Sequence, residues 1–238
     1  MKTLVFDIKG DLGHFRKFYT TSSPLTFSFP PPPTVKGVLG AIYGAAKEDY
    51  LKLFSSDQCK IAIRIMSPIK KVRMGINLIN TKDNFWQPIK KGRHEARTQI
   101  RTEFVKDPAY RIYFSHNNQN VFEQMAELVK NHEEYYTVSL GLSELIADIS
   151  YVCTNDFLEF NAQKVDIMSV IPLSSIEDYG IDFEEGKRYF RELIPVDMNP
   201  ERIVERYEDV IFEMDGNSIR ATMKRFWKNS NGDCIAFF

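Results

Sequence analysis

The residues best suited to bind a ligand lie in one short loop near the N-terminus. Residues 14–19 read HFRKFY, so a histidine, two cations and three aromatic rings occupy six consecutive positions. Lys and Arg side chains bind phosphate oxygens, and aromatic ring faces stack on unpaired nucleobases. We therefore expect this loop to contact nucleic acid. The alternative is a surface loop whose rings pack into the core.

A second basic segment, residues 90–104, reads KKGRHEARTQIRTEF. Arg93, Arg97 and Arg101 recur every fourth residue, with Gln99 and threonines among them. Arg matches phosphate oxygens with a planar fork, while Gln and Thr reach 2′-hydroxyls and base edges. A spacing of four places the three arginines on one face of either a helix or a strand. The alternative is a set of surface ion pairs with Glu95, Glu103 and the acidic C-terminal region.

Signatures of catalysis are few. The chain has no HExxH, GxSxG or Walker A motif and no paired His or Cys at metal-ligand spacing, so we predict no metal and no cofactor. A metal-independent ribonuclease needs only a general base and a general acid near a 2′-hydroxyl. His94, flanked by Lys90, Lys91 and Arg93 and combined with Tyr43, is the best group for that role. A histidine in a basic segment is more often an RNA contact, which is our first interpretation of His94.

Composition indicates an ordinary globular protein with segregated charge. The 238 residues are 43% hydrophobic and 26% charged, with a net charge of −1. Residues 60–111 hold 13 Lys and Arg against 4 Asp and Glu, whereas residues 120–215 hold 7 against 22. A polyanion would be attracted to the first block, although such blocks are usually solvated faces.

The sequence has no pattern of a secreted or membrane protein. The three cysteines are too few and too far apart for a disulfide framework, and no apolar run is long enough to span a membrane. The N-terminus also lacks the pattern of a secretory signal. These features predict a cytoplasmic protein without membrane contact.

The hydrophobic periodicity predicts an α+β fold that holds both basic segments. Strands are predicted at residues 2–9, 60–67, 110–114 and 148–154, and helices at 121–129 and from Thr34, the expected N-cap after Pro30–Pro33. This order is the βαββαβ of a ferredoxin-like (RRM-like) domain. We assign that domain to residues 1–155, with a projecting β-hairpin at about 68–105 in which Asn77, Asn80 and Asn84 are turn formers.

Three further features complete the outline. Residues 156–238 are predicted to be a β-rich C-terminal extension, with strand-like runs at 165–170, 192–196, 204–212 and 235–238. The first helix carries Gly37, Gly40 and Gly44, which either admit an RNA chain or pack against a neighbouring element. The role of the basic patch near residues 220–228 is left open.

Several segments resemble the CRISPR-associated protein 5 family. They are FDIKGDLGHFRKFYT, FPPPPTVKGVLGAIYG, RTQIRTEFVKDPAYRIYF and SLGLSELIA, and the resemblance extends from residue 1 to about 150. It is closest to the form found in type I-B interference complexes. The resemblance implies a RAMP-type protein with a ferredoxin-like core and a β-hairpin thumb.

In that family the protein caps one end of the Cascade surveillance complex and grips the 5′ handle of the CRISPR RNA. Its partners would be the adjacent backbone subunit and the large subunit, with target DNA contacted through the complex. The RNA contacts implied by the resemblance, together with the basic segment, are His14, Arg16, Lys17, Tyr19, Lys36, Arg93, His94, Arg97, Gln99 and Arg101.

One branch of the family also cuts precursor RNA with a Tyr on the first helix and a Lys-His pair. Tyr43 lies on the predicted first helix, but the local pair is Arg93 and His94. An arginine is always protonated at neutral pH and cannot act as a general acid or base. We therefore expect an RNA-binding scaffold for antiviral defence rather than an enzyme. The alternatives are a metal-independent endoribonuclease that processes precursor CRISPR RNA and a generic RRM-like RNA-binding protein.

Overall fold

The computed structural model describes residues 1–20, 23–79 and 97–238. Its centre is an antiparallel group of four strands in the order β7-β1-β6-β3, part of a larger sheet. These strands are β1 (Lys2–Lys9), β3 (Cys59–Ile65), β6 (Ala109–His116) and β7 (Asp148–Ile167). Helix α1 (Pro32–Tyr43) lies between β1 and β3 in the sequence, and α3 (Gln119–Lys130) lies between β6 and β7.

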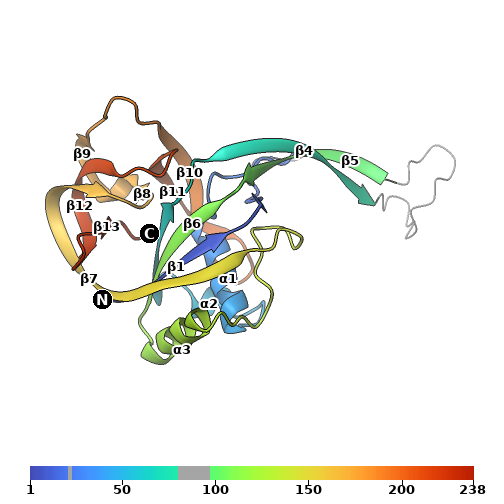
Figure 1. Ribbon diagram of the computed structural model, residues 1–238, viewed down its shortest axis with the longest axis horizontal. Helices are drawn as coiled ribbons and strands as arrows, with labels where there is room; N and C mark the ends of the chain where they lie inside the picture. The colour runs from blue at the N-terminus through green and yellow to red at the C-terminus, as the bar shows by residue number, and fades with distance from the viewer. Residues whose placement is uncertain (21–22, 80–96) are drawn as a thin grey trace.

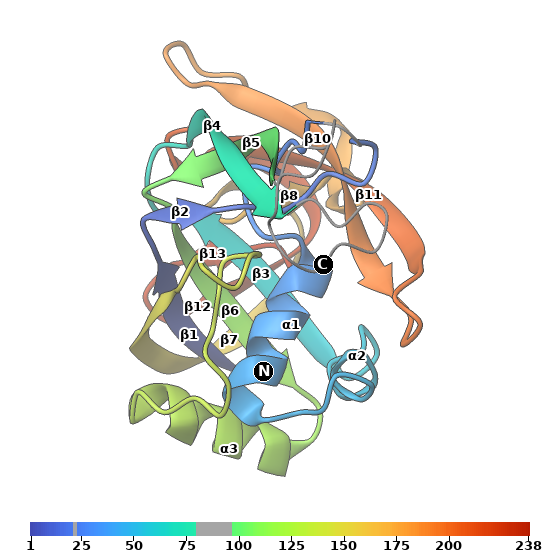
Figure 2. The ribbon, with the colours of Figure 1, turned by 90° about the vertical axis from the view of Figure 1, so that its right-hand side faces the viewer.

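Both helices cover the same face of the four strands, as Figure 2 shows. Phe6 of β1 and Phe114 of β6 are fully buried in one core with Leu39 of α1 and Met125 of α3. The short helix α2 (Tyr50–Leu53) follows α1. The prediction of a strand-rich α+β fold with few helices is confirmed.

Helix α1 begins at Pro32, two residues before the predicted N-cap Thr34. Pro31 is the N-cap, and proline is tolerated in the first helical turn because the N–H that it lacks has no intrahelical partner there. Thr34 lies inside that turn and donates its backbone N–H to Pro31 O at 2.8 Å.

Strand β7 is 20 residues long and joins the two halves of the chain. Residues 148–156 pair with β1, and residues 157–167 pair with β12 (Ile219–Asn229). The predicted domain boundary after residue 155 therefore lies inside one continuous strand. Strands β9 (Ile176–Ile181) and β13 (Cys234–Ile235) also pair with β12.

The curled sheet returns the C-terminus to the face opposite the helices. Trp227 and Phe237 form a buried cluster there with Val5 and Tyr113. A separate sheet has the order β10-β11-β8, with β8 (Ile171–Pro172), β10 (Tyr189–Met198) and β11 (Val204–Glu213), and a 3-10 turn at Leu173–Ser175 follows β8. Phe212 of this sheet packs against Phe29 with ring centroids 5.3 Å apart.

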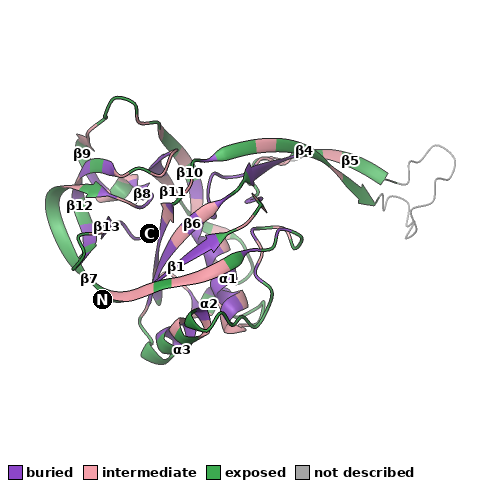
Figure 3. Ribbon diagram, in the orientation of Figure 1, coloured by how far each residue is buried: buried purple, intermediate pink, exposed green. Residues whose placement is uncertain are grey.

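The remaining strands form an arm that projects from the core (Figure 1). Strands β4 (Lys70–Ile79) and β5 (Arg97–Lys106) pair antiparallel over their whole length, and β2 (Leu12–Gly13) pairs with the base of β5. Figure 3 shows that this base is buried while the outer part is exposed. Asn77 lies within β4 and not in a turn, because its register partner is Gln99.

No helix in the described part of the chain is long and apolar enough to cross a membrane.

Candidate nucleic-acid interface

The loop that follows β2 is ordered by pairing with itself. Arg16 and Thr26 form an antiparallel bridge, and Phe27 N donates to Phe15 O at 2.7 Å. The Phe15 N–H in turn donates to Thr26 Oγ1 at 2.8 Å. These bonds hold residues 14–20 in one conformation beside the hairpin.

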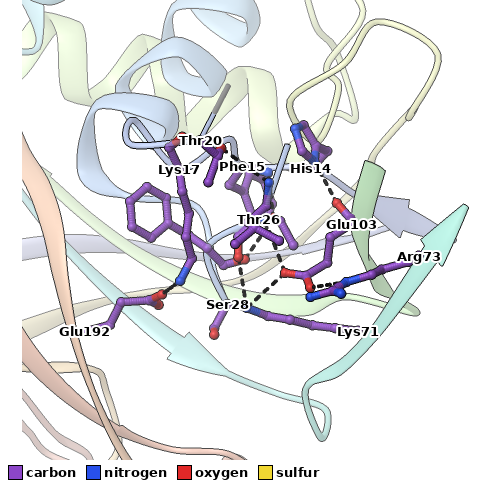
Figure 4. Close-up of polar contacts among 12 residues, drawn as sticks. His14, Phe15, Lys17, Thr20, Thr26, Ser28, Lys71, Arg73, Glu103 and Glu192 are labelled. Atoms are coloured by element: carbon purple, nitrogen blue, oxygen red, sulfur yellow. Dashed lines mark hydrogen bonds and ion pairs between the residues drawn. The ribbon is translucent and has the colours of Figure 1, made fainter. Parts of the chain in front are cut away.

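Glu103 of β5 joins this loop to the base of the hairpin (Figure 4). Its carboxylate accepts from Arg73 Nε at 3.1 Å and from the Thr26 backbone N–H at 3.4 Å. Lys71 Nζ lies 3.8 Å from the same carboxylate and donates to Thr26 O at 2.8 Å. Burial lowers the pKa of Lys71. The ion pair that we considered for Glu103 therefore exists, and its partners among the described residues, Lys71 and Arg73, are on β4.

The hairpin has two chemically different faces because side chains alternate along each strand. Arg97, Gln99 and Arg101 lie on one face, opposite Ile79, Asn77 and Gly75 in the register, and all three are exposed. Neither arginine forms an ion pair with another residue in the described ranges. The spacing of four therefore gives a shared cationic face, as predicted.

The other face of the hairpin is apolar and lies over a pocket of about 470 Å³. The hairpin contributes Ile76, Leu78, Ile100 and Thr102 to the lining. The opposite wall comes from the loop at His14–Arg16, from Thr34 at the start of α1, and from residues 141–144.

A second pocket, of about 400 Å³, continues along α1 and shares Thr34 and Gly141 with the first. Its floor includes Gly37 and Ala41, and Arg202 lies at its side with the guanidinium carbon 5.9 Å from the Tyr50 ring. Together the two pockets make one groove from the apolar face of the hairpin along α1, which we call the α1 groove.

The three glycines of α1 have three different roles. Gly37 lines the α1 groove, and a Cβ there would meet only Tyr50, at 3.9 Å. Gly40 packs against Tyr50, because a Cβ would lie 2.8 Å from that side chain. Gly44 ends the helix with a φ of 83°.

Five of the predicted contact residues are exposed near the hairpin and the loop: Arg16, Tyr19, Arg97, Gln99 and Arg101. Three others are held inside the protein: His14, Lys17 and Lys36. Arg93, His94 and Lys91 lie outside the described residues.

Lys36 is the clearest departure from expectation. Its side chain is 2% exposed, and Nζ lies 2.9 Å from Asp197 Oδ1 and 3.0 Å from Ser56 Oγ. A side chain with this burial has no surface to offer a phosphate. We therefore leave Lys36 out of the interface and assign it to the junction between α1 and β10.

Lys17 and His14 are also tied to the protein. Lys17 donates to Glu192 of β10; burial lowers its pKa, but the hydrogen bond and charge of Glu192 raise it overall. His14 is 5% exposed, and its Nδ1 lies 2.7 Å from Glu103 O. Both residues fix the loop against its surroundings.

Some aromatic residues of the loop pack into the core, and others are exposed as a nucleic-acid contact requires. Phe15 is buried, whereas Phe18 and Tyr19 are 50% and 59% exposed. Phe18 contacts Tyr19 and also Tyr207 of β11, with centroids 5.1 Å and 4.9 Å apart. Exposed rings are thus available for stacking beside the basic hairpin.

Tyr43, named for the nuclease alternative, lies on α1 with its ring 6.1 Å from that of Phe54. It is half-buried. Because His94 and Lys91 lie outside the described residues, the geometry of that group is not defined.

The C-terminal basic patch is balanced by acidic residues. Arg220 lies 3.4 Å from Asp166, and Arg225 lies 4.0 Å from Glu159 on the paired strand β7. Lys224 donates to Ser174 O at 3.3 Å. These contacts indicate a structural role for the patch.

The apolar pocket wall was not predicted, although a signal for it was present in the sequence. Val72, Met74, Ile76 and Leu78 are apolar at every second position, the period of a strand with one apolar face. Gly141 and Leu142 in the opposite wall carry no such pattern, because they belong to an irregular loop.

Comparison with known proteins gives the family. The model described as "CRISPR-associated protein (Cas_Cas5)" matches residues 3–210. The chain belongs to the CRISPR-associated protein 5 family. No curated protein shows a significant match to this member of the family.

Solved structures share the fold of this family member at low sequence identity. A CRISPR protein from Archaeoglobus fulgidus has a TM-score of 0.58 and 14% identity, with 99% of this chain and 98% of that chain covered. A chain of a structure described as "CRISPR RNA-guided surveillance complex" has a TM-score of 0.56 and 10% identity, with 92% and 91% covered. The fold is therefore that of CRISPR proteins.

Proposed function

We propose that this protein is a structural subunit of a type I surveillance complex, of type I-B or a similar subtype, that binds CRISPR RNA and caps its 5′ handle. Membership of the CRISPR-associated protein 5 family supports the assignment. The observation that carries it is the α1 groove, which runs from the apolar face of the hairpin along α1 and has the exposed Arg16 in its lining, while Arg97 and Arg101 lie on the opposite face of the hairpin.

We further infer that the core is ferredoxin-like. The strand order β7-β1-β6-β3, with α1 after the first strand and α3 after the third, supports this assignment. The hairpin is then an insertion between the second and third core strands, which corresponds to the thumb of the family.

Single-stranded RNA would bind through two kinds of contact. Arg97 and Arg101 on the cationic face, and Arg16 on the loop, would bind phosphates, while Tyr19 would stack on a splayed base. Phosphate contacts would set the position of the RNA, and base contacts would set its register. A rigid loop held by Glu103 keeps these groups in place before RNA arrives.

In the assembled complex we expect the adjacent backbone subunit and the large subunit to contact this protein, with target DNA reached through them. One surface of the β10-β11 sheet combines apolar and acidic groups: Leu193 is 45% exposed, and its register partner is Asp209. We expect it to receive a protein and not RNA, because carboxylates crowd the same strands.

The test is RNA binding as a function of salt. Arg97→Ala and Arg101→Ala should each weaken binding of a single-stranded RNA. The logarithm of the association constant falls linearly with the logarithm of the salt concentration, and each variant should make this slope less steep by about 0.7 for each phosphate that it no longer neutralises. Arg225→Ala is the matched control, because Arg225 is an exposed strand arginine that pairs with Glu159. Unchanged slopes in both hairpin variants would contradict the proposed phosphate contacts.

The same samples separate binding from cleavage. Incubation with a repeat RNA in EDTA should return the RNA intact, since we propose a scaffold. A single specific product that disappears in His94→Ala would instead establish a metal-independent nuclease. Equal affinity for a repeat-derived handle and a scrambled RNA would indicate a generic RNA-binding protein.

A further inference from the structure

The pocket beneath the apolar face of the hairpin is lined mainly by apolar side chains and hydrogen-bond acceptors, which a phosphate site does not need. We propose that it holds one unstacked nucleobase with an exocyclic amino group, and this proposal rests on the proposed binding of single-stranded RNA. Its volume of about 470 Å³ lies within the range of small-molecule sites in proteins.

The walls of the pocket suit the flat, apolar faces of a base. Ile76, Leu78 and Ile100 of the hairpin form one side, and Phe15 and Leu142 belong to the other. These side chains come from segments that are far apart in the sequence, and the hairpin brings them together. A base that leaves its stack would recover apolar contact on both faces here.

His14 supplies a fixed polar group in this lining. Its Nδ1 lies 2.7 Å from the backbone carbonyl oxygen of Glu103, which can only accept, so Nδ1 carries the hydrogen. In the neutral imidazole the other nitrogen, Nε2, is then an acceptor. Nε2 has no hydrogen-bond partner among the described residues, and Figure 4 shows it on the side of the ring away from Glu103.

The His14 ring is held in one place, although Nε2 has no partner among the described residues. The His14 backbone N–H donates to Leu140 O at 2.8 Å, and its ring lies 5.6 Å from that of Phe104. Gly141 passes so close that an added Cβ would collide with His14 O. A rigid acceptor in the wall of a pocket, without a partner among the described residues, is suited to a ligand that brings a donor.

The rim adds a second acceptor and so predicts which bases fit. Glu144 lines the pocket and is exposed, and its carboxylate only accepts hydrogen bonds. Cytosine, adenine and guanine carry exocyclic amino N–H donors, whereas uracil has carbonyl oxygens and no amino group. The pocket should therefore prefer any of these three bases over uracil.

The experiment uses the full chain and homopolymers, so that the same base enters the pocket in any register. The wild-type protein should bind an eight-nucleotide oligo(rC) about three- to tenfold more tightly than oligo(rU), the effect of one additional hydrogen bond. Glu144→Gln should reduce this ratio, because the amide offers an N–H to the uracil carbonyl. Glu127→Gln, an exposed residue on α3 with the same change of charge, should not.

The apolar wall is tested separately, because His14 also holds the hairpin and its replacement risks misfolding. Leu78→Ser should weaken both oligomers at least about threefold, whereas Leu193→Ser, with a similar exposure of 45% against 47%, should weaken neither.

The outcomes distinguish this proposal from the proposed function. Three results would overturn the base pocket and leave the RNA-binding function in place: equal affinity for both oligomers, a ratio that Glu144→Gln does not change, or affinities that Leu78→Ser does not change. A pocket occupied by a protein side chain would give these results. The absence of any binding to either oligomer overturns both.

Discussion

The ion pair between Lys36 and Asp197 gives the sharpest test of how the structure reassigns a predicted RNA contact. The Lys36 side chain is 2% exposed, whereas the Asp197 side chain is 27% exposed. The two deletions should therefore have unequal costs. Asp197→Ala leaves an ammonium group buried with only Ser56 as a partner, whereas Lys36→Met leaves a carboxylate that water and the Met198 N–H, 3.2 Å away, still reach.

The magnitudes follow from this asymmetry. Removing one partner of a buried pair costs about 3–5 kcal/mol, and the partial exposure of Asp197 places Asp197→Ala near about 3 kcal/mol. Lys36→Met removes the buried charge itself and should cost only about 1 kcal/mol. At about 2–4 °C per kcal/mol for a chain of this size, Asp197→Ala should lower the Tm by about 6–12 °C.

Urea denaturation at neutral pH measures both free energies of unfolding, and RNA binding is measured on the same proteins. Equal losses of stability would refute the asymmetry. Lys36→Met should retain the wild-type salt dependence of RNA binding. A slope reduced by about 0.7 with unchanged stability would show that Lys36 binds phosphate after all.

The pH dependence gives a second check. Burial raises the pKa of Asp197, but the hydrogen bond and charge of Lys36 lower it overall. Because the folded-state pKa lies below the unfolded value of about 3.9, the stabilisation is complete above that pH and is lost as the pH falls towards the folded-state pKa. The stability difference between wild type and Asp197→Asn should therefore narrow below about pH 4.

Three further predictions concern other parts of the fold. Glu103→Gln keeps the acceptor but removes the charge facing the β4 cations, and should lower the free energy of unfolding by about 1–2 kcal/mol, measured in urea. Gly141→Ala should lower the free energy of unfolding by at least about 3 kcal/mol, because φ is 105° and the new Cβ would collide with His14 O. Gly186→Ala, with a φ of 83° and no atom within 4 Å of the new Cβ, should lower it by only about 1–2 kcal/mol. Burial raises the pKa of the Cys59 thiol to about 12, so iodoacetamide at pH 8 should label it only in denaturant, as read by mass spectrometry; rapid labelling of the native thiol would contradict this burial.

Local patterns predicted the elements better than the roles of individual charges. The alternation in residues 2–9 and 60–67 predicted β1 and β3, because a period of two is the pattern of a strand. The structure nevertheless buries both faces of β1, so this strand is not half-buried. The burial of Lys36 was not predictable in this way, since its partner Asp197 is 161 residues away and only the packing of β10 against α1 brings them together. The sequence alone does not show whether a lysine or arginine is exposed or is held in an ion pair by a residue far along the chain.

The hairpin shows the same limit at the site itself. The spacing of Arg97 and Arg101 was sufficient to place them on one face, whichever secondary structure they adopted. It did not reveal that the opposite face closes a pocket, because that pocket also needs His14 and residues 141–144, which reach the hairpin through loops without periodicity. Side-chain alternation is local, whereas a cavity is a property of tertiary structure.

The segregation of charge along the sequence acquires a physical meaning from these contacts. Two carboxylates of the acidic half, Glu192 and Asp197 on β10, neutralise Lys17 and Lys36 at the loop and at α1. A division of the chain after residue 155 would leave both cations without these partners and would cut β7 within its pairing to β1. The C-terminal sheet thus holds the inner cations in ion pairs, while the arginines farther out on the hairpin face solvent. The position of the α1 groove therefore depends on both halves of the chain, although most of its lining comes from the first.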